Sequence, residues 1–157
     1  MIEKLGGALD RVVVALLSLG FAALIVTVGL QVLARNVLKI PLIWTLDVAQ
    51  LLFVWLIFVG AAVAYRRSAH YSIDLVPDGH PRIGLALDLF SDFAALVVVI
   101  VLVRYGAMLT GMRSHGEIGS LGISEAWSYA AIPTGGALIG IFLVEKVLSD
   151  LLRARPR

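Results

Sequence analysis

The 157-residue sequence contains no cysteine, and it has few charged residues for its length. Without cysteine, a disulfide framework, a thiol nucleophile and a cysteine-ligated metal site are all excluded. Charged residues make up 15% of the chain and hydrophobic residues 60%, with a mean hydropathy of +0.96. Soluble domains have roughly 25% charged residues and about half apolar residues. The composition therefore indicates an integral membrane protein.

Charge is scarcest in four long apolar stretches, each close to the length of about 20 residues that a membrane-spanning helix needs. Only helices and closed barrels satisfy backbone polar groups in lipid, and the alternation of barrel strands is missing here. The first stretch exceeds the roughly 7 to 15 apolar residues of a signal peptide, so we expect a retained helix. The sequence predicts one all-α membrane domain over residues 1–157, with four transmembrane helices in a bundle. The expected helices cover about 12–34, 46–65, 86–110 and 129–150.

The distribution of basic residues predicts the orientation of these helices. Four spans place both termini and the loop 66–84 on one side of the membrane. Two basic residues before the first span, three in this loop and four at the C-terminal end make nine, against three in the loops 35–45 and 111–128. By the positive-inside rule, the termini and the loop 66–84 are cytoplasmic and the other loops periplasmic. The basic C-terminal end also suggests contact with membrane lipid, and no aromatic interleaving indicates nucleic-acid binding.

The second predicted helix opens with WTLDVAQLLFVW, residues 44–55, where polar side chains precede an apolar run. At 100° per residue, Trp44 and Trp55 project from nearly the same side, with Asp47 within about 60° of them. In a purely structural interpretation, Trp44 lies in the interfacial aromatic belt and Asp47 caps the helix. In the functional interpretation, this face docks another membrane subunit, which the depth of Trp55 favours.

Arg104 is the one basic residue within the third predicted helix. A central charge costs about 2.5–3.5 kcal/mol on insertion scales. Its guanidinium can snorkel towards the outer end of the helix. The alternative is an ion pair with Asp47, which lies in the same half of the membrane.

Asp88 and Asp92 share one face near the other end of the third helix. Two carboxylates at this spacing could bind a cation or relay protons, but they more often cap the helix and pair with nearby bases. Glu145 and the adjacent Lys146 are expected at the membrane interface. The candidate bases for the two aspartates are Arg66, Arg67 and Lys146.

Small residues are spaced four apart at two positions. Gly136 and Gly140 form a GxxxG pair, which allows helix backbones to approach closely, and Gly60 and Ala64 form a weaker pair of this kind. Both predict helix packing.

His70 and Asp74 are four residues apart in the loop 66–84. A metal site needs three or four ligands of suitable geometry, so we predict no metal site. No nucleophile–base arrangement or phosphate loop is visible, and we do not expect an enzyme.

The run WTLDVAQLLFVWLIFVGAAVAYRRSAHYSID, residues 44–74, resembles the signature of the small, DctQ-like membrane subunit of tripartite ATP-independent periplasmic (TRAP) transporters. The stretch LGISEAWSYAAIPTGGAL is similar to the segment that leads into the family's fourth helix, so the resemblance covers nearly the whole chain. The matching residues of the first run are Trp44, Asp47, Val54, Trp55, Gly60, Ala61, Ala62, Arg66, Arg67, His70 and Asp74.

Two positions depart from the family pattern. Leu46 stands where the first of two acidic residues is usual, and Gln50 stands where an arginine is common. If the acidic residue and the arginine form an ion pair in relatives, this chain lacks that ion pair. A hydrogen bond between Asp47 and Gln50 would replace it in part.

The resemblance implies a three-component system in a bacterial inner membrane. A periplasmic binding protein captures the substrate, often an organic-acid anion, and a large permease subunit transports it with a sodium gradient. The small subunit, this chain, enlarges the static scaffold of the large one. It implies no cofactor here, with the sodium ions bound by the large subunit.

Two other classes compete with this interpretation. A stand-alone transporter of the small multidrug-resistance type needs a carboxylate deep in its first span, and residues 12–34 contain none. A membrane assembly or anchor protein is the other class. Haem ligation finds no support, because paired intramembrane histidines are missing.

Overall fold

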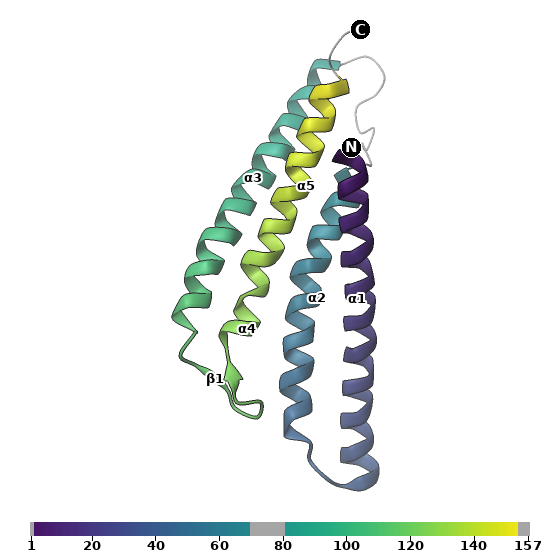
Figure 1. Cartoon of the computed structure of the whole chain (residues 1–157), viewed down its shortest axis with the longest axis vertical. Coiled ribbons are helices and arrows are strands. Elements are labelled where there is room, and N and C mark those ends of the chain that lie inside the picture. Colours follow the sequence, from purple (N-terminus) through teal and green to yellow (C-terminus); the bar gives the residue numbers. More distant parts are fainter. Residues whose placement is uncertain (1, 70–80, 154–157) are drawn as a thin grey trace.

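The computed structural model describes residues 2–69 and 81–153, almost all of them in helices (Figure 1). Four segments are long and apolar enough to cross a membrane, which confirms that part of the sequence prediction. The elements in chain order are α1 (Ile2–Leu33), the π-helical turn η1 (Ala34–Leu38), α2 (Ile43–Ala69), α3 (Pro81–Met112), β1 (Glu117–Ile118), β2 (Ile123–Ser124), α4 (Ala126–Tyr129) and α5 (Ala131–Arg153).

The helices extend further than the predicted spans, because helical backbone continues past the apolar residues into polar ones. The polar residues 2–11 contain no proline, so α1 begins at Ile2 rather than near residue 12. Helix α3 starts at Pro81, in the first helical position, where the missing N–H has no intrahelical partner to lose. The structure places the start of α1 and the end of α5 at the same end of the molecule (Figure 1).

The segment between α3 and α5, predicted as a loop, contains a small antiparallel hairpin and the short helix α4. Glu117 pairs with Ser124 and Ile118 with Ile123, and Gly122 in the connection has a φ of 61°, which favours glycine. Strands of two residues are too short to produce an alternating pattern in the sequence.

The four long helices pack side by side as a layer in the order α1, α2, α5, α3. Extensive contacts among the described residues join α1 to α2, α2 to α5, and α5 to α3, so α1 and α3 lie at the two edges (Figure 1). Contact between α1 and α5 is slight; Leu9 packs against the cluster formed by Ala62, Ile139 and Phe142.

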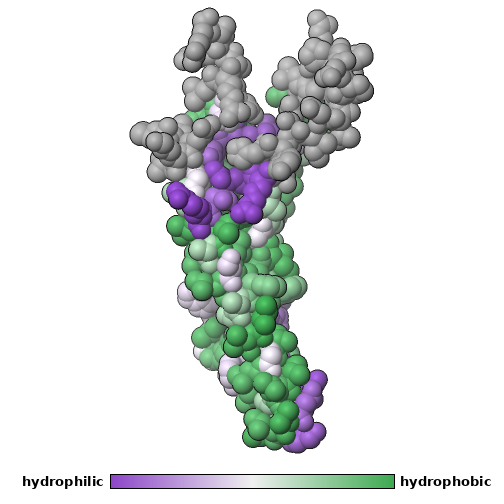
Figure 2. All heavy atoms as spheres, turned by 90° about the vertical axis from the view of Figure 1, so that its right-hand side faces the viewer, coloured by the Kyte–Doolittle hydropathy of each residue, from purple (hydrophilic) through white to green (hydrophobic). Residues whose placement is uncertain are grey.

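Apolar side chains cover most of the surface of this layer. Figure 2 shows a hydrophobic middle region, with hydrophilic residues gathered mainly towards the end that carries the start of α1. Helix α5 is the most enclosed, with 28% of its apolar window buried, against 6% for α1 and α3. In lipid, an exposed apolar surface of this kind needs no further protein cover.

Glycines of α5 allow its close approach to both α2 and α3. A Cβ on Gly135 would lie 2.7 Å from the carbonyl oxygen of Phe58 in α2, and one on Gly136 would lie 2.7 Å from the Cβ of Leu102 in α3. The predicted pair Gly136 and Gly140 therefore faces α3, since a Cβ on Gly140 would lie 3.1 Å from Val99.

The other predicted pair of small residues makes no such contact with the described part of the chain. Nothing lies within 4 Å of a Cβ built on Gly60, and Ala64 is exposed.

Substituting Gly135→Ala should destabilise the chain by about 1–3 kcal/mol, because the added methyl group meets the backbone of α2. The matched control is Gly60→Ala, which has open space and should be neutral or stabilising by up to about 1 kcal/mol through helix propensity. Thermal unfolding of the two purified variants in detergent micelles measures the difference. Equal midpoints would contradict the packing described above.

Candidate functional site

At the end of the layer that carries the start of α1, charged side chains from all four long helices come together. We call these residues the charge cluster: Asp10, Arg66, Arg67, Asp92, Glu145 and Lys146.

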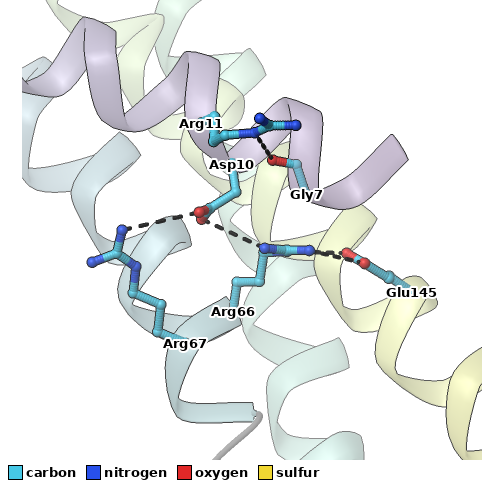
Figure 3. A network of polar contacts seen from close by, with 6 residues as sticks. All are labelled: Gly7, Asp10, Arg11, Arg66, Arg67 and Glu145. Atoms are coloured by element: carbon cyan, nitrogen blue, oxygen red, sulfur yellow. Dashed lines mark hydrogen bonds and ion pairs between the residues drawn. The ribbon is translucent and has the colours of Figure 1, made fainter. Parts of the chain in front are cut away.

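The central contact of the charge cluster joins Arg66 of α2 to Glu145 of α5 (Figure 3). Arg66 Nε donates to Glu145 Oε2 at 3.1 Å, and Nη2 donates to Oε1 at 3.0 Å. The two side chains are only 13% and 10% exposed. The guanidinium also lies 5.4 Å from the centre of the Phe142 ring. This bidentate geometry is the strong form of an arginine–carboxylate pair.

Asp10 brings α1 to the same arginine (Figure 3). Its Oδ1 lies 3.7 Å from Arg66 Nη1, and its Oδ2 lies 4.0 Å from Arg67 Nη2. Both distances are too long for hydrogen bonds, and Oδ1 is buried without a hydrogen-bond partner. Among the described residues, Asp10 is therefore held by charge attraction rather than by hydrogen bonds. Arg67, whose side chain is 61% exposed, contributes little to this attraction.

Asp92 of α3 forms an ion pair with Lys146 of α5. Both side chains are about one-fifth exposed, at 21% and 19%. Lys146 is one of the three bases that the sequence offers to the aspartates of this helix. Because Glu145 and Lys146 are adjacent, α5 forms an ion pair with Arg66 of α2 and another with Asp92 of α3.

At the other end of the layer, α2 is tied to the hairpin and α4 by hydrogen bonds. The Asp47 carboxylate accepts bonds from the backbone N–H of Ser120, at 3.2 Å, and from the Ser120 hydroxyl. The Trp55 indole donates to the carbonyl of Trp127 at 3.0 Å. Two of the three residues that define the predicted docking face, Asp47 and Trp55, thus make hydrogen bonds within the chain.

The structural role predicted for Asp47 needs correction in detail. Helix α2 begins at Ile43, so Asp47 lies one turn inside the helix and does not cap it. Both of its hydrogen bonds go to Ser120, and neither Gln50 nor Arg104 is its partner. Trp44 is 42% exposed and remains on the surface.

A cavity of about 440 Å³ opens between α2 and the segment that follows α3. Asp47 and Gln50 line it from α2, and Glu125 and Tyr129 line it from the opposite wall. The Glu125 carboxylate accepts a 3.3 Å bond from Arg113 Nη1, whose guanidinium lies 5.6 Å from the Tyr129 ring. Within the described residues, no group of three acidic or histidine side chains could hold a metal ion.

Of the remaining predicted candidates, Arg104 stands apart from the charge cluster. Arg104 lies exposed on α3, and no ion pair or hydrogen bond joins its side chain to another described residue. His70 and Asp74 lie outside the described residues, and so does the side chain of Asp88.

Sequence reasoning did not single out Asp10, Ser120 or Glu125. A signal for Asp10 was present, because it precedes the first apolar stretch on the side where Arg66 and Arg67 need counter-charges. Ser120 carried no comparable signal, since its contact with Asp47 spans 73 residues of chain.

Substituting Arg66→Gln should cost about 3–5 kcal/mol of unfolding free energy, because Glu145 is left as an unpaired buried charge. The double variant Arg66→Met with Glu145→Leu should be less damaging than either single change, since it removes both charges. The control Arg67→Gln should change stability by less than about 0.5 kcal/mol. Equilibrium unfolding in mixed micelles measures all of these, and equal losses for Arg66 and Arg67 would refute the assignment.

Substituting Asp47→Ala should speed amide hydrogen exchange at Ser120 by about tenfold or more, since a bond to a charged group contributes about 1.5–3 kcal/mol. Gln50→Ala, on an exposed neighbour in α2, should leave that exchange unchanged. Mass spectrometry of exchanged peptides across the hairpin makes the comparison. Unaltered exchange in Asp47→Ala would show that the hairpin is held by other contacts.

Comparison with known proteins relates this arrangement to one family. Residues 24–153 match the family profile described as tripartite ATP-independent periplasmic transporters, DctQ component. The chain is 29% identical over 150 residues to the sialic acid TRAP transporter small permease protein SiaQ of Vibrio cholerae, which covers 95% of this chain and 85% of that protein. It is 22% identical over 131 residues to a putative TRAP transporter small permease protein of Haemophilus influenzae, over 83% of this chain and 81% of the relative.

A further similarity lies within a larger protein. The chain is 33% identical over 104 residues to the sialic acid TRAP transporter permease protein SiaT of Haemophilus influenzae, which covers 66% of this chain and 17% of that protein. These relatives are transporter components by name rather than enzymes. With a profile match over most of its length and four helices suited to a membrane, the chain belongs to the DctQ component family of tripartite ATP-independent periplasmic transporters.

Proposed function

We propose that this small permease braces a large permease subunit as part of the static scaffold of a TRAP transporter, while a periplasmic binding protein delivers the substrate. The match to the DctQ component family over residues 24–153 carries this proposal. The similarity to 17% of SiaT supports the partnership, because in that relative a similar segment is covalently part of a larger permease protein.

The ion pairs of the described spans support a scaffold role over a carrier role. A carrier needs an acidic or basic group that can exchange its partner for a substrate or a proton. Here Glu145 is held by Arg66, Asp92 by Lys146, and Asp10 lies next to two arginines. Paired in this way, the acids fix the four helices against one another.

The names of the relatives suggest the class of substrate. Two of them are sialic acid transporters by name, and sialic acid is an organic-acid anion. We propose an anion of this class, taken up with sodium ions that bind the large subunit and not this chain. No cofactor is needed for bracing.

The positive-inside distribution supports an orientation in the bacterial inner membrane with both termini in the cytoplasm. The charge cluster then lies near the cytoplasmic boundary. The hairpin and the cavity beside Asp47 face the periplasm, from which a binding protein would approach.

Reconstitution in liposomes tests the proposal. With a sodium gradient, the large permease, the binding protein and this chain together should take up labelled sialic acid, and omission of this chain should reduce uptake at least tenfold. The chain alone should give no uptake, because the described acids of its spans are already held by other groups of the chain. Uptake by the chain alone, or full uptake by the large permease without it, would overturn the scaffold role.

A further inference from the structure

Arg104 is an exposed cation on α3, at one edge of the layer, and its side chain has no ion-pair partner among the described residues. It is exposed, and it belongs to α3, whose apolar span covers Leu89–Met112. Eight residues separate it from Met112, about 12 Å of helix, and fifteen separate it from Leu89, about 22 Å. The guanidinium is therefore attached well inside the span, and no ion pair or hydrogen bond joins it to a described residue.

Snorkelling towards the nearer end of α3 is opposed by the direction of the helix. The Cα–Cβ bonds of an α-helix tilt towards its N-terminus, and long side chains follow that direction. Helix α3 runs from Pro81 to Met112, so the Arg104 side chain is directed back towards the middle of the span and away from the nearer end. Snorkelling is effective near helix ends, which Arg104 is not.

No acidic side chain of the described residues pairs with Arg104. The neighbours of Arg104 on the same face of α3 are apolar and exposed: Ile100 at 54%, Val101 at 45% and Met108 at 61%. Among the described acids of the spans, Glu145 and Asp92 are paired at the opposite end of the layer, and the Asp47 carboxylate is bonded to Ser120.

We propose that the exposed face of α3 around Arg104 is the surface that docks against the large permease, where a carboxylate on a transmembrane helix of that subunit pairs with the guanidinium. This inference rests on the proposed function. Charge complementarity selects the partner, because a cation fixed at this depth needs an anion at the same depth. A lipid phosphate lies at the membrane surface, whereas an acidic side chain of a neighbouring helix can lie opposite Arg104.

Co-purification from membranes tests the ion pair. The large permease of the same transporter is co-expressed with tagged variants, and its amount per small subunit is measured. Arg104→Leu should reduce it at least tenfold, and Arg104→Glu should reduce it further through repulsion. Arg104→Lys should retain an intermediate amount, since the charge stays while the bidentate geometry is lost. The control Met108→Leu, on the same face, should match the wild type.

Crosslinking locates the surface independently of the charge. The chain lacks cysteine, so a single introduced cysteine reports without background. A cysteine in Val101→Cys or Met108→Cys, carrying a photoactivatable crosslinker, should capture the large permease. A cysteine in Val26→Cys, 68% exposed on α1 at the opposite edge, should capture none.

The outcomes separate the two proposals. If the wild-type chain fails to co-purify with the large permease, the proposed function fails and this inference fails with it. If the wild-type complex forms but Arg104→Leu leaves it intact, as a lipid partner for Arg104 would predict, only the docking surface is overturned. Crosslinks from Val26→Cys without any from the α3 sites would overturn it as well.

Discussion

The two central helices of the layer, α2 and α5, each contribute one member of the Arg66–Glu145 pair, and the rest of the arrangement depends on this contact. A buried charge without its partner is strongly destabilising, so the two side chains must stay in contact. This contact fixes the register of α2 against α5. The pair lies against the Phe142 ring, which belongs to the apolar cluster with Ala62 and Ile139. Helix α1 joins through Asp10 next to Arg66, and α3 joins through Lys146, the residue beside Glu145.

The two ends of the layer are held by different means. The charge cluster connects side chains to side chains, whereas at the hairpin end Asp47 and Trp55 bond to backbone groups of the segment that follows α3. Between the two ends, glycines such as Gly135 and Gly136 let α5 approach both neighbours. Contacts distributed over the length of α5 hold both of its neighbours, which agrees with the bracing role proposed above.

Much of this could be predicted from the sequence. The four apolar stretches predicted the long helices, because length and hydropathy alone decide whether a helix can cross lipid. The aspartate pattern of α3 also predicted a base as the partner of Asp92. The order of the helices in the layer could not be predicted, since contacts between α2 and α5 depend on chain positions far apart, such as Phe58 and Gly135. The contact of Asp47 with Ser120 could not be predicted for the same reason. The sequence placed Glu145 at the membrane interface and did not predict its ion pair with Arg66.

The spans of the layer differ in length, and this affects the surrounding bilayer. The helical segment formed by α1 and η1, Gly7–Leu38, has 32 residues, whereas the membrane-length segments of α2, of α3 and of α4 with α5 have 24 or 25. At 1.5 Å per residue the first is about 48 Å long, against about 36 Å for a 24-residue span. Hydrocarbon cores measure about 30 Å, and an overlong span is accommodated by leaning or by locally thickened lipid. Here the excess length is polar at both ends, since Arg11 and Arg35 are exposed about 36 Å apart along the helix. Because α1 occupies an edge, these two guanidiniums can reach the headgroups of the neighbouring lipids on both sides, which makes this edge sensitive to the anionic lipid content of the host membrane.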